Sequence, residues 1–216
     1  MIMLKPLCLS LLFASTIFAQ DITTELEKKN PIIQQDKGTP NTLKISGKDT
    51  INVSDENGEL QGQWERTHPD GSFKCKGEYK DGYKMGYWER KWPNGNWRYQ
   101  INMKDGYRHG YCKFYYENGN IEKEGNYKMN KEDGLILTFY ENGNLLSEET
   151  FKNGVLHGLC KYFDENGTLT REGAFLENKR NGLWKFYSPK TSKLSSQITL
   201  VEYDKGQAIS TKISAF

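Results

Sequence analysis

The three histidines of the chain are the first candidates for chemistry, because imidazole can hold a metal ion or carry a proton. His109 and His157 stand in similar segments, "YRHG" and "VLHG", two repeats apart, whereas His68 stands in a different context. Ligands must converge to about 2 Å from one metal ion. Equivalent positions in separate repeats do not converge in this way. We therefore interpret the histidines as turn-stabilising residues and expect no metal and no cofactor.

The cysteines are the next candidates, because they could form disulfides. Cys75, Cys112 and Cys160 lie outside the N-terminal apolar segment and are odd in number. Cys112 and Cys160 occupy equivalent positions four strands apart, which at about 4.8 Å per strand is roughly 19 Å and too far for a disulfide. Cys75 lies about three strands, or roughly 14 Å, from Cys112 by the same spacing. We expect three free, packed thiols, and pairing between molecules is the alternative.

Carboxylates are plentiful, but their positions do not suit catalysis. Glu117, Glu141 and Glu165 recur at the same place beside each turn. A general acid–base pair needs two carboxyl groups in one shielded site with separated pKa values, and solvated turns do not offer that. No nucleophile motif and no phosphate-binding glycine loop is present in the sequence. We expect that the protein is not an enzyme.

Composition and charge limit the fold and the partners further. Of 216 residues, 36% are hydrophobic and 13% are aromatic, and 21 are glycine. This mixture of rings and glycines with few aliphatic residues favours short strands and tight turns. The 30 basic and 28 acidic side chains leave a net charge of +2 and are interspersed along the chain. Such a balance gives no reason to expect nucleic-acid binding.

The N-terminal residues 1–19 have the features of a secretory signal peptide. "MIMLKP" carries one lysine, "LCLSLLFASTIFA" is apolar but too short to span a membrane, and Ala19 precedes polar residues. We expect export to the periplasm, the cell envelope or the medium, and a retained membrane anchor is the alternative. Residues 20–50 are polar and without sustained periodicity, which predicts a flexible spacer.

Two phased series of glycines define a repeat of 24 residues. One series is Gly62, Gly86, Gly110, Gly134, Gly158 and Gly182, and the other is Gly71, Gly95, Gly119, Gly143 and Gly167. An Asp or Asn precedes each glycine of the second series. Fixed self-similarity of this kind indicates a repeat architecture. We expect an array over residues 51–209 and a C-terminal tail over residues 210–216.

Each repeat has the pattern of a β-hairpin. An Asn-Gly pair between two strand-like runs predicts a two-residue type I′ turn. With Asn94-Gly95 at the tip, Trp92 should face Trp97. The same counting places Trp64, Cys112 and Cys160 opposite Gly77, Gly125 and Gly173. The predicted fold is all-β: an elongated, twisted, antiparallel sheet of consecutive β-hairpins. Lone hairpins are marginal, so neighbouring units must supply the stability.

An aromatic and basic cluster in the second and third hairpins is the candidate partner-binding site. A surface rich in Trp, Tyr and Arg has the composition of a binding hot spot. A structural role, in which these rings only stabilise a one-layer sheet, is the alternative. The candidate residues are Trp88, Arg90, Trp92, Trp97, Arg98, Tyr99, Tyr111 and Tyr115.

The repeat resembles the MORN-repeat variant family, found in bacterial proteins often labelled as YwqK-type antitoxins. The resemblance rests on the pattern G-x-W-x-x-Y-x-x-N-G followed by G-x-Y-K-D-G-x-x-x-G, over roughly residues 51–206. It implies an antiparallel sheet of successive hairpins that serves as a scaffold for a protein or a membrane. The sequence departs from the family's apolar or aromatic preference at Gln63, Arg90 and Thr138.

Three functions remain open at this stage. The first is an exported, non-catalytic scaffold that binds another, unidentified protein, with toxin neutralisation as an option implied only by the family label. The second is a structural envelope component that self-associates through its edges. The third is a module that contacts the membrane or cell wall by binding lipid head groups or glycans.

Overall fold

The computed structural model describes residues 44–46, 49–188 and 197–215, and in these residues the chain forms strands and no helix. Accordingly, none of the described segments is an apolar helix that could cross a membrane. The strands are β1 (Lys44–Ser46), β2 (Asp49–Ile51), β3 (Val53–Ser54), β4 (Leu60–Thr67), β5 (Phe73–Lys80), β6 (Tyr83–Lys91), β7 (Trp97–Lys104), β8 (Tyr107–Tyr115), β9 (Ile121–Lys128), β10 (Lys131–Phe139), β11 (Leu145–Lys152), β12 (Val155–Phe163), β13 (Leu169–Leu176), β14 (Lys179–Ser188), β15 (Gln197–Asp204) and β16 (Gln207–Ala215).

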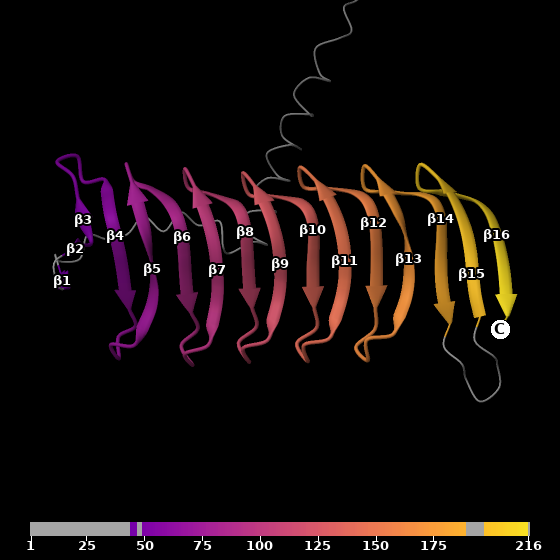
Figure 1. Ribbon diagram of the computed structural model, residues 1–216, viewed down its shortest axis with the longest axis horizontal. Helices are drawn as coiled ribbons and strands as arrows, with labels where there is room; N and C mark the ends of the chain where they lie inside the picture. The colour runs from indigo at the N-terminus through magenta and orange to yellow at the C-terminus, as the bar shows by residue number, and fades with distance from the viewer. Residues whose placement is uncertain (1–43, 47–48, 189–196, 216) are drawn as a thin grey trace, which may run out of the picture. The chain divides into compact units, whose positions relative to one another are not determined.

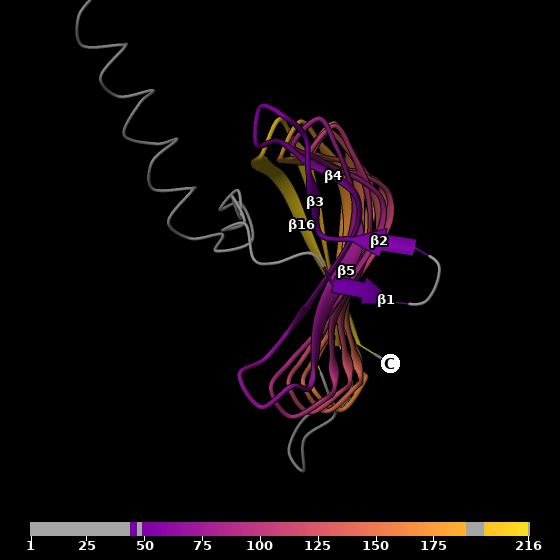
Figure 2. The same cartoon turned by 90° about the vertical axis from the view of Figure 1, so that its left-hand side faces the viewer.

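The strands from β3 to β16 form one open antiparallel sheet of 14 strands, in which each strand pairs with its neighbours in the sequence (Figure 1). This confirms the predicted all-β sheet of consecutive hairpins. Seen along the sheet, the strands are bent rather than straight (Figure 2). The strands β1 and β2 pair only with each other.

The predicted signal peptide and residues 20–43 of the predicted spacer lie outside the described residues. The short hairpin of β1 and β2 lies in the last part of the range expected to be a spacer. At the other end, β16 continues past the expected end of the array at position 209 to Ala215, because it pairs with β15 along its length. Residues 210–215 of the expected tail therefore belong to the last strand, and Phe216 lies outside the described residues.

The tips that contain the Asn-Gly pairs are not type I′ turns, so this prediction is wrong. At the tip between β6 and β7, the amide of Gly95 donates to the carbonyl of Trp92 (3.0 Å), and the amide of Trp92 donates to the carbonyl of Asn96 (2.8 Å). Gly95 has a φ of 91°, whereas Asn94 is not among the residues with positive φ. These features describe a type I turn followed by a bulged glycine, and Pro93 suits it because its ring fixes φ at about −65°.

The bulged glycine shifts the pairing beside each tip by one residue. Trp97 pairs with Lys91 and not with Trp92. Beyond the bulge the predicted register is restored, because Arg90 pairs with Tyr99 as in the two-residue turn. The predicted pairs Trp64–Gly77, Cys112–Gly125 and Cys160–Gly173 are likewise confirmed.

The type I′ turns occur at the opposite ends of the strands, where one unit connects to the next. Asp81 and Gly82 both have positive φ, of 51° and 76°, and form a two-residue connection between β5 and β6. Asn130 and Asn178 replace glycine in two such turns and have φ of 67° and 64°. Asn tolerates this conformation better than most residues, as expected from the sequence.

Asparagine side chains link successive tips. The Nδ2 groups of Asn118 and Asn120 both donate to the carbonyl of Glu141 in the next unit, at 2.8 Å each. Asn142 and Asn144 bond the carbonyl of Glu165 in the same way, at 2.9 and 2.7 Å. The repeated Asn therefore fixes the spacing of neighbouring hairpins in addition to shaping its own turn.

Candidate protein-binding surface

A bulge in each even-numbered strand from β6 to β14 is the local feature from which the surface is built. Where β8 pairs with β7, Ile101 faces Cys112 but Met103 faces Arg108, so β8 has two extra residues. Gly110 lies in this bulge with a φ of 96°, which glycine adopts without a steric penalty. The same register shift recurs in β6, β10, β12 and β14. The first glycine series thus marks bulges, which bend and locally twist a strand.

The residue after each bulge glycine forms a row of exposed apolar side chains, here called the outer row. The outer-row side chains are between 45% and 73% exposed and recur every second strand, about 10 Å apart. The row extends over five consecutive units. The outer row consists of Tyr87, Tyr111, Leu135, Leu159 and Leu183.

Neighbouring side chains bind the carbonyls of two outer-row residues. The Nδ2 group of Asn102 donates to the carbonyl of Tyr111 (2.7 Å), and the Oγ1 hydroxyl of Thr150 donates to the carbonyl of Leu159 (2.8 Å). These bonds satisfy backbone groups that the bulge takes out of the regular ladder. They also fix the backbone of these two outer-row residues.

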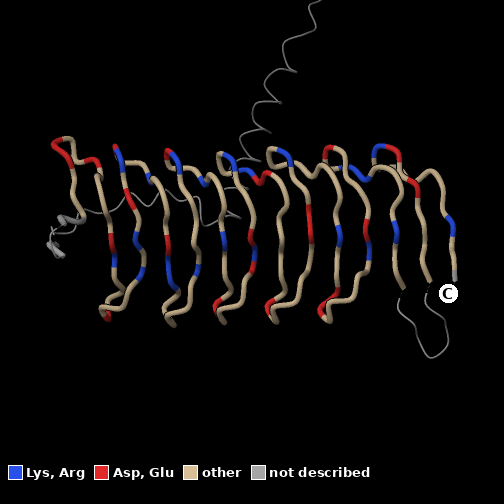
Figure 3. The backbone as a smooth tube through the Cα atoms, viewed as in Figure 1, with Lys and Arg blue, Asp and Glu red and all other residues tan. Residues whose placement is uncertain are grey.

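Cross-strand ion pairs lie beside the outer row on the same face. Lys113 pairs with Glu124 at 2.9 Å, Lys161 with Glu148 at 3.1 Å, and two further pairs are Lys76–Glu89 and Lys185–Glu172. Each pair joins residues that are directly opposite in the register. Basic and acidic residues accordingly alternate across the sheet rather than gathering in one region (Figure 3). This face therefore presents apolar side chains among charges that are already matched.

Tyrosine hydroxyls extend the same networks. The hydroxyl of Tyr111 donates to Glu124 Oε2 (2.7 Å), and the hydroxyl of Tyr115 donates to Gln100 Oε1 (2.6 Å). Burial and the bond to Glu124 raise the pKa of Tyr111 to about 12. Burial raises the pKa of the Glu124 carboxyl, but the hydrogen bonds from Lys113 and Tyr111 outweigh it and lower that pKa overall. Tyr111 is thus an exposed ring with a fixed orientation.

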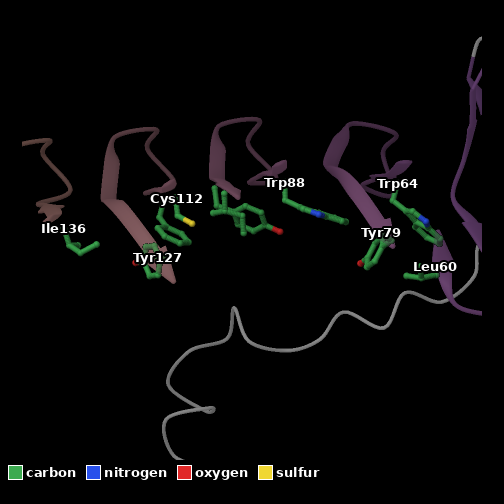
Figure 4. Close-up of a cluster of buried hydrophobic side chains, with 10 residues drawn as sticks. Leu60, Trp64, Tyr79, Trp88, Cys112, Tyr127 and Ile136 are labelled. Carbon is green, nitrogen blue, oxygen red and sulfur yellow. The ribbon is translucent and has the colours of Figure 1, made fainter. Parts of the chain in front are cut away.

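The opposite face carries a buried row, here called the inner row, whose members from Trp88 onward lie one residue after those of the outer row. Figure 4 shows Trp64, Trp88, Cys112 and Ile136 of this row on one side of the sheet, with Tyr79 and Tyr127 beside them. All inner-row side chains are at most 4% exposed. The inner row consists of Trp64, Trp88, Cys112, Ile136, Cys160 and Trp184.

Large inner-row side chains cover glycines of the preceding strand. A Cβ added to Gly77 would overlap the indole ring of Trp88, and one added to Gly173 would overlap that of Trp184. A glycine is therefore covered by the ring of the strand that follows it. Trp64 lies opposite Gly77 as predicted, but the ring that covers this glycine is that of Trp88.

The two inner-row cysteines occur where the neighbouring strand offers a large residue in place of glycine. Cys112 pairs with Ile101, and Cys160 pairs with Glu149. A small side chain is thus matched to a large one, which keeps the packing volume constant. Cys75, Cys112 and Cys160 are free and buried, as predicted. Burial raises the pKa of all three thiols, which disfavours the reactive thiolate.

The register divides the predicted partner-binding residues between the two faces. Cross-strand partners share a face, so the pairs Arg90–Tyr99 and Trp88–Ile101 place these residues with the inner row. Trp88 and Tyr99 are buried, at 3% and 7% exposed, and offer little surface to a partner.

The remaining candidates are more accessible. By strand alternation, Trp97 lies on the inner-row face, whereas Arg98, Tyr111 and Tyr115 lie on the outer-row face. Trp92 lies in the tip, where its Nε1 group donates to the carbonyl of Tyr115 (3.1 Å) and the Arg98 guanidinium covers its ring at 4.4 Å. The eight residues do not form one continuous patch.

Sequence reasoning missed Leu135, Leu159 and Leu183 as surface residues. Their signal was present, because each is the apolar residue directly after a glycine of the first series. The alternation of side chains along a strand does not reveal that this position lies in a bulge. The exposed row becomes evident only when the bulge is known.

The histidines do not gather. His109 and His157 were expected in turns, but they lie in the strands β8 and β12, within the bulges. His68 lies in the first tip. The described residues contain no group of three or more His, Cys, Asp or Glu side chains that could hold a metal ion.

The sequence of these hairpins is similar to a known repeat. Three consecutive repeats match the MORN repeat variant. The matched segments are residues 108–129, 132–153 and 156–177, and they coincide with the hairpins β8–β9, β10–β11 and β12–β13. No curated protein matches the chain. The MORN repeat matches are consistent with a repeat scaffold, which agrees with the open sheet described above.

Proposed function

We propose that the chain is a non-catalytic MORN-repeat scaffold that binds another protein through the outer row. The observation that carries this proposal is the alignment of five exposed apolar side chains over five units. Soluble proteins rarely expose apolar side chains in such continuous arrangements, and those that do commonly use them for binding.

The geometry favours an elongated partner with one apolar stripe. Five side chains about 10 Å apart span roughly 40 Å. An amphipathic helix presents equivalent side chains every seven residues, or about 10.5 Å, which is close to the spacing of the outer row. The partner should be weakly charged along this stripe, because the lysines and glutamates beside the row already neutralise one another.

The N-terminal sequence supports export, so the partner would be a protein of the cell envelope or the medium. Cell fractionation with an antibody against the array tests this part, and a purely cytosolic pool would contradict it. Neutralisation of a toxin is supported only by the family resemblance. Co-expression with toxin-like proteins encoded nearby, scored as recovery of growth, tests that option.

The test of the binding surface compares three forms of the protein. Leu135→Ser/Leu159→Ser removes the middle of the outer row, and Lys128→Ser is a surface control in the same region, since Lys128 is exposed. Proteins captured from the native envelope by the wild type are then purified and offered to all three forms. Their direct binding is measured by calorimetry.

We expect a loss of at least tenfold in affinity for the outer-row variant and little change for the control. Equal binding by all three forms would contradict the proposal. Retention on lipid vesicles or cell-wall fragments that depends on the same leucines would instead favour a lipid- or glycan-binding surface.

A further inference from the structure

The two ends of the sheet differ in how their outer edges are closed. At the N-terminal end, Asn52 covers β4, because its amide donates to the carbonyl of Gln63 (2.9 Å) and its Oδ1 accepts the amide of Glu65 (2.9 Å). The strand β3, with only two residues, pairs with the beginning of β4. These contacts occupy backbone groups that a further strand would need.

At the C-terminal end, β16 has a neighbouring strand on one side only within the described residues. Its nine residues, "QAISTKISA", contain no proline, glycine or acidic residue, and Lys212 is the one charged side chain. Natural edge strands are commonly protected by charges, proline or shortness. This strand is long, nearly uncharged and β-branched at three positions, Ile209, Thr211 and Ile213.

The isoleucines of β16 are exposed because, among the described strands, β16 has a neighbour on one side only. Trp184 pairs with Val201, which pairs with Thr211, so the inner-row face continues into β16. Val201 has strands on both sides and is 9% exposed. Ile213, two residues beyond Thr211 on the same face, is 63% exposed, and Ile209 is 65% exposed. One additional strand beside β16 would cover them.

Even-numbered strands of this sheet are built to accept such a strand. The strand β14 is bulged against β13 but pairs regularly with β15 from Gly182 to Ser188. The strand β16 is also bulged against its preceding strand, β15, but by one extra residue, between the pairs of Glu202 and Tyr203, where β14 has two. The outer edge of β16 is therefore comparable to the edge by which β14 pairs with β15.

We propose that β16 pairs antiparallel with β16 of a second copy about a two-fold axis at Thr211, which closes a dimer. In this register Ile209 lies opposite Ile213 of the second copy, and Lys212 lies opposite Ser210. An axis at Lys212 would place two ammonium groups opposite each other, which is unfavourable. Because the N-terminal edge is covered, head-to-tail growth is blocked and assembly stops at two copies. This inference is independent of the outer row.

The first test measures mass by light scattering over a concentration series. The wild type should approach the mass of two chains, and Ile213→Lys should raise the dissociation constant at least tenfold while retaining the β-sheet circular dichroism signal. Leu183→Lys is the matched control, because it introduces lysine at an exposed residue of β14, which has a neighbouring strand on each side. A wild type that stays at one chain, a mass that grows past two chains, or an unchanged Ile213→Lys variant would overturn the proposal.

The second test locates the axis. Thr211→Cys places one thiol of each copy at the axis, within disulfide distance of the other, and mild oxidation should yield a covalent dimer. Leu183→Cys should not cross-link. The three native thiols of the described residues are buried and do not compete. Equal cross-linking of both variants, or none in Thr211→Cys, would overturn the register.

Discussion

The inner and outer rows lie one residue apart on the same strands, yet their environments are opposite. Trp184 is fully buried, whereas Leu183 is 49% exposed, and Cys160 is 1% exposed beside Leu159 at 73%. Alternation explains why the two rows lie on different faces. It does not explain why one face buries its side chains so completely in a sheet of one layer. The difference teaches that the packing of the inner row depends on the neighbouring strand, which offers a glycine beside a large side chain and a large residue beside Cys112 and Cys160. The outer row lies in the bulges and has no such complement.

The largest expected effect separates the two rows by stability. Trp184→Ala should lower the free energy of unfolding by about 3–5 kcal/mol, because it removes a fully buried ring that contacts Phe175 and Tyr203. Leu183→Ala should change it by less than about 0.5 kcal/mol. Urea denaturation followed by tryptophan fluorescence and circular dichroism measures both. Similar losses for the two variants would break the comparison.

The second prediction concerns the glycine under the inner row. Gly173→Ala should cost about 1–3 kcal/mol, because the added methyl group overlaps the indole of Trp184. The cost of this substitution should be smaller in a Trp184→Cys background, which imitates the natural pairing of Cys160 with Glu149. A double-mutant cycle measures the coupling between the two positions. Additive effects would show that volume is not matched between these strands.

The third prediction concerns the links between hairpins, which hold both rows in line. Asn142→Ala removes the bond to the carbonyl of Glu165 and should cost about 0.5–1.5 kcal/mol. Glu165→Ala keeps that carbonyl and serves as the control. Thermal unfolding measured for both variants tests the assignment, and a control that is equally destabilised would contradict it.

The smallest expected effect is a pH dependence confined to the outer row. The pKa of Tyr111 is raised to about 12 in the folded chain from an ordinary value of 10.0, mainly by burial and by Glu124. The folded state therefore favours the protonated hydroxyl. Its contribution to stability is complete below pH 10 and is lost as the pH rises from 10 towards about 12.

Tyr111→Phe should abolish this part of the pH dependence and remove one late-titrating phenol from the ultraviolet absorbance curve. Tyr83→Phe is the control, because Tyr83 is also exposed. An unchanged titration in Tyr111→Phe would show that the bond to Glu124 does not hold in solution.

Much of the fold could be predicted from the sequence because the repeat multiplies weak local signals. The glycine series located the hairpins from β4–β5 to β12–β13, and the pairing of Cys112 with Gly125 was correct. The turn types could not be predicted in the same way. Asn-Gly pairs suit both a type I′ turn and a type I turn with a bulged glycine, and the choice depends on contacts such as that between Asn118 and Glu141 of the next unit.

The candidate surface was harder to predict than the fold. Composition pointed to the aromatic cluster around Trp88 and Tyr99, but these rings are buried in the inner row or beside it. Large rings are equally suited to binding a partner and to covering a strand glycine. Leu135, Leu159 and Leu183 carry no comparable signal as single residues.

By itself the sequence determined the all-β class, the 24-residue period, the order of the hairpins and the isolation of the thiols. These follow from residue types whose backbone preferences act locally, above all glycine and asparagine, and from a spacing that repeats. Only the tertiary structure decided the bulges, the covering of Gly77 by Trp88, and the exposure of the outer row. Those features depend on how a neighbouring strand fills or leaves the space beside each residue, which no local pattern specifies.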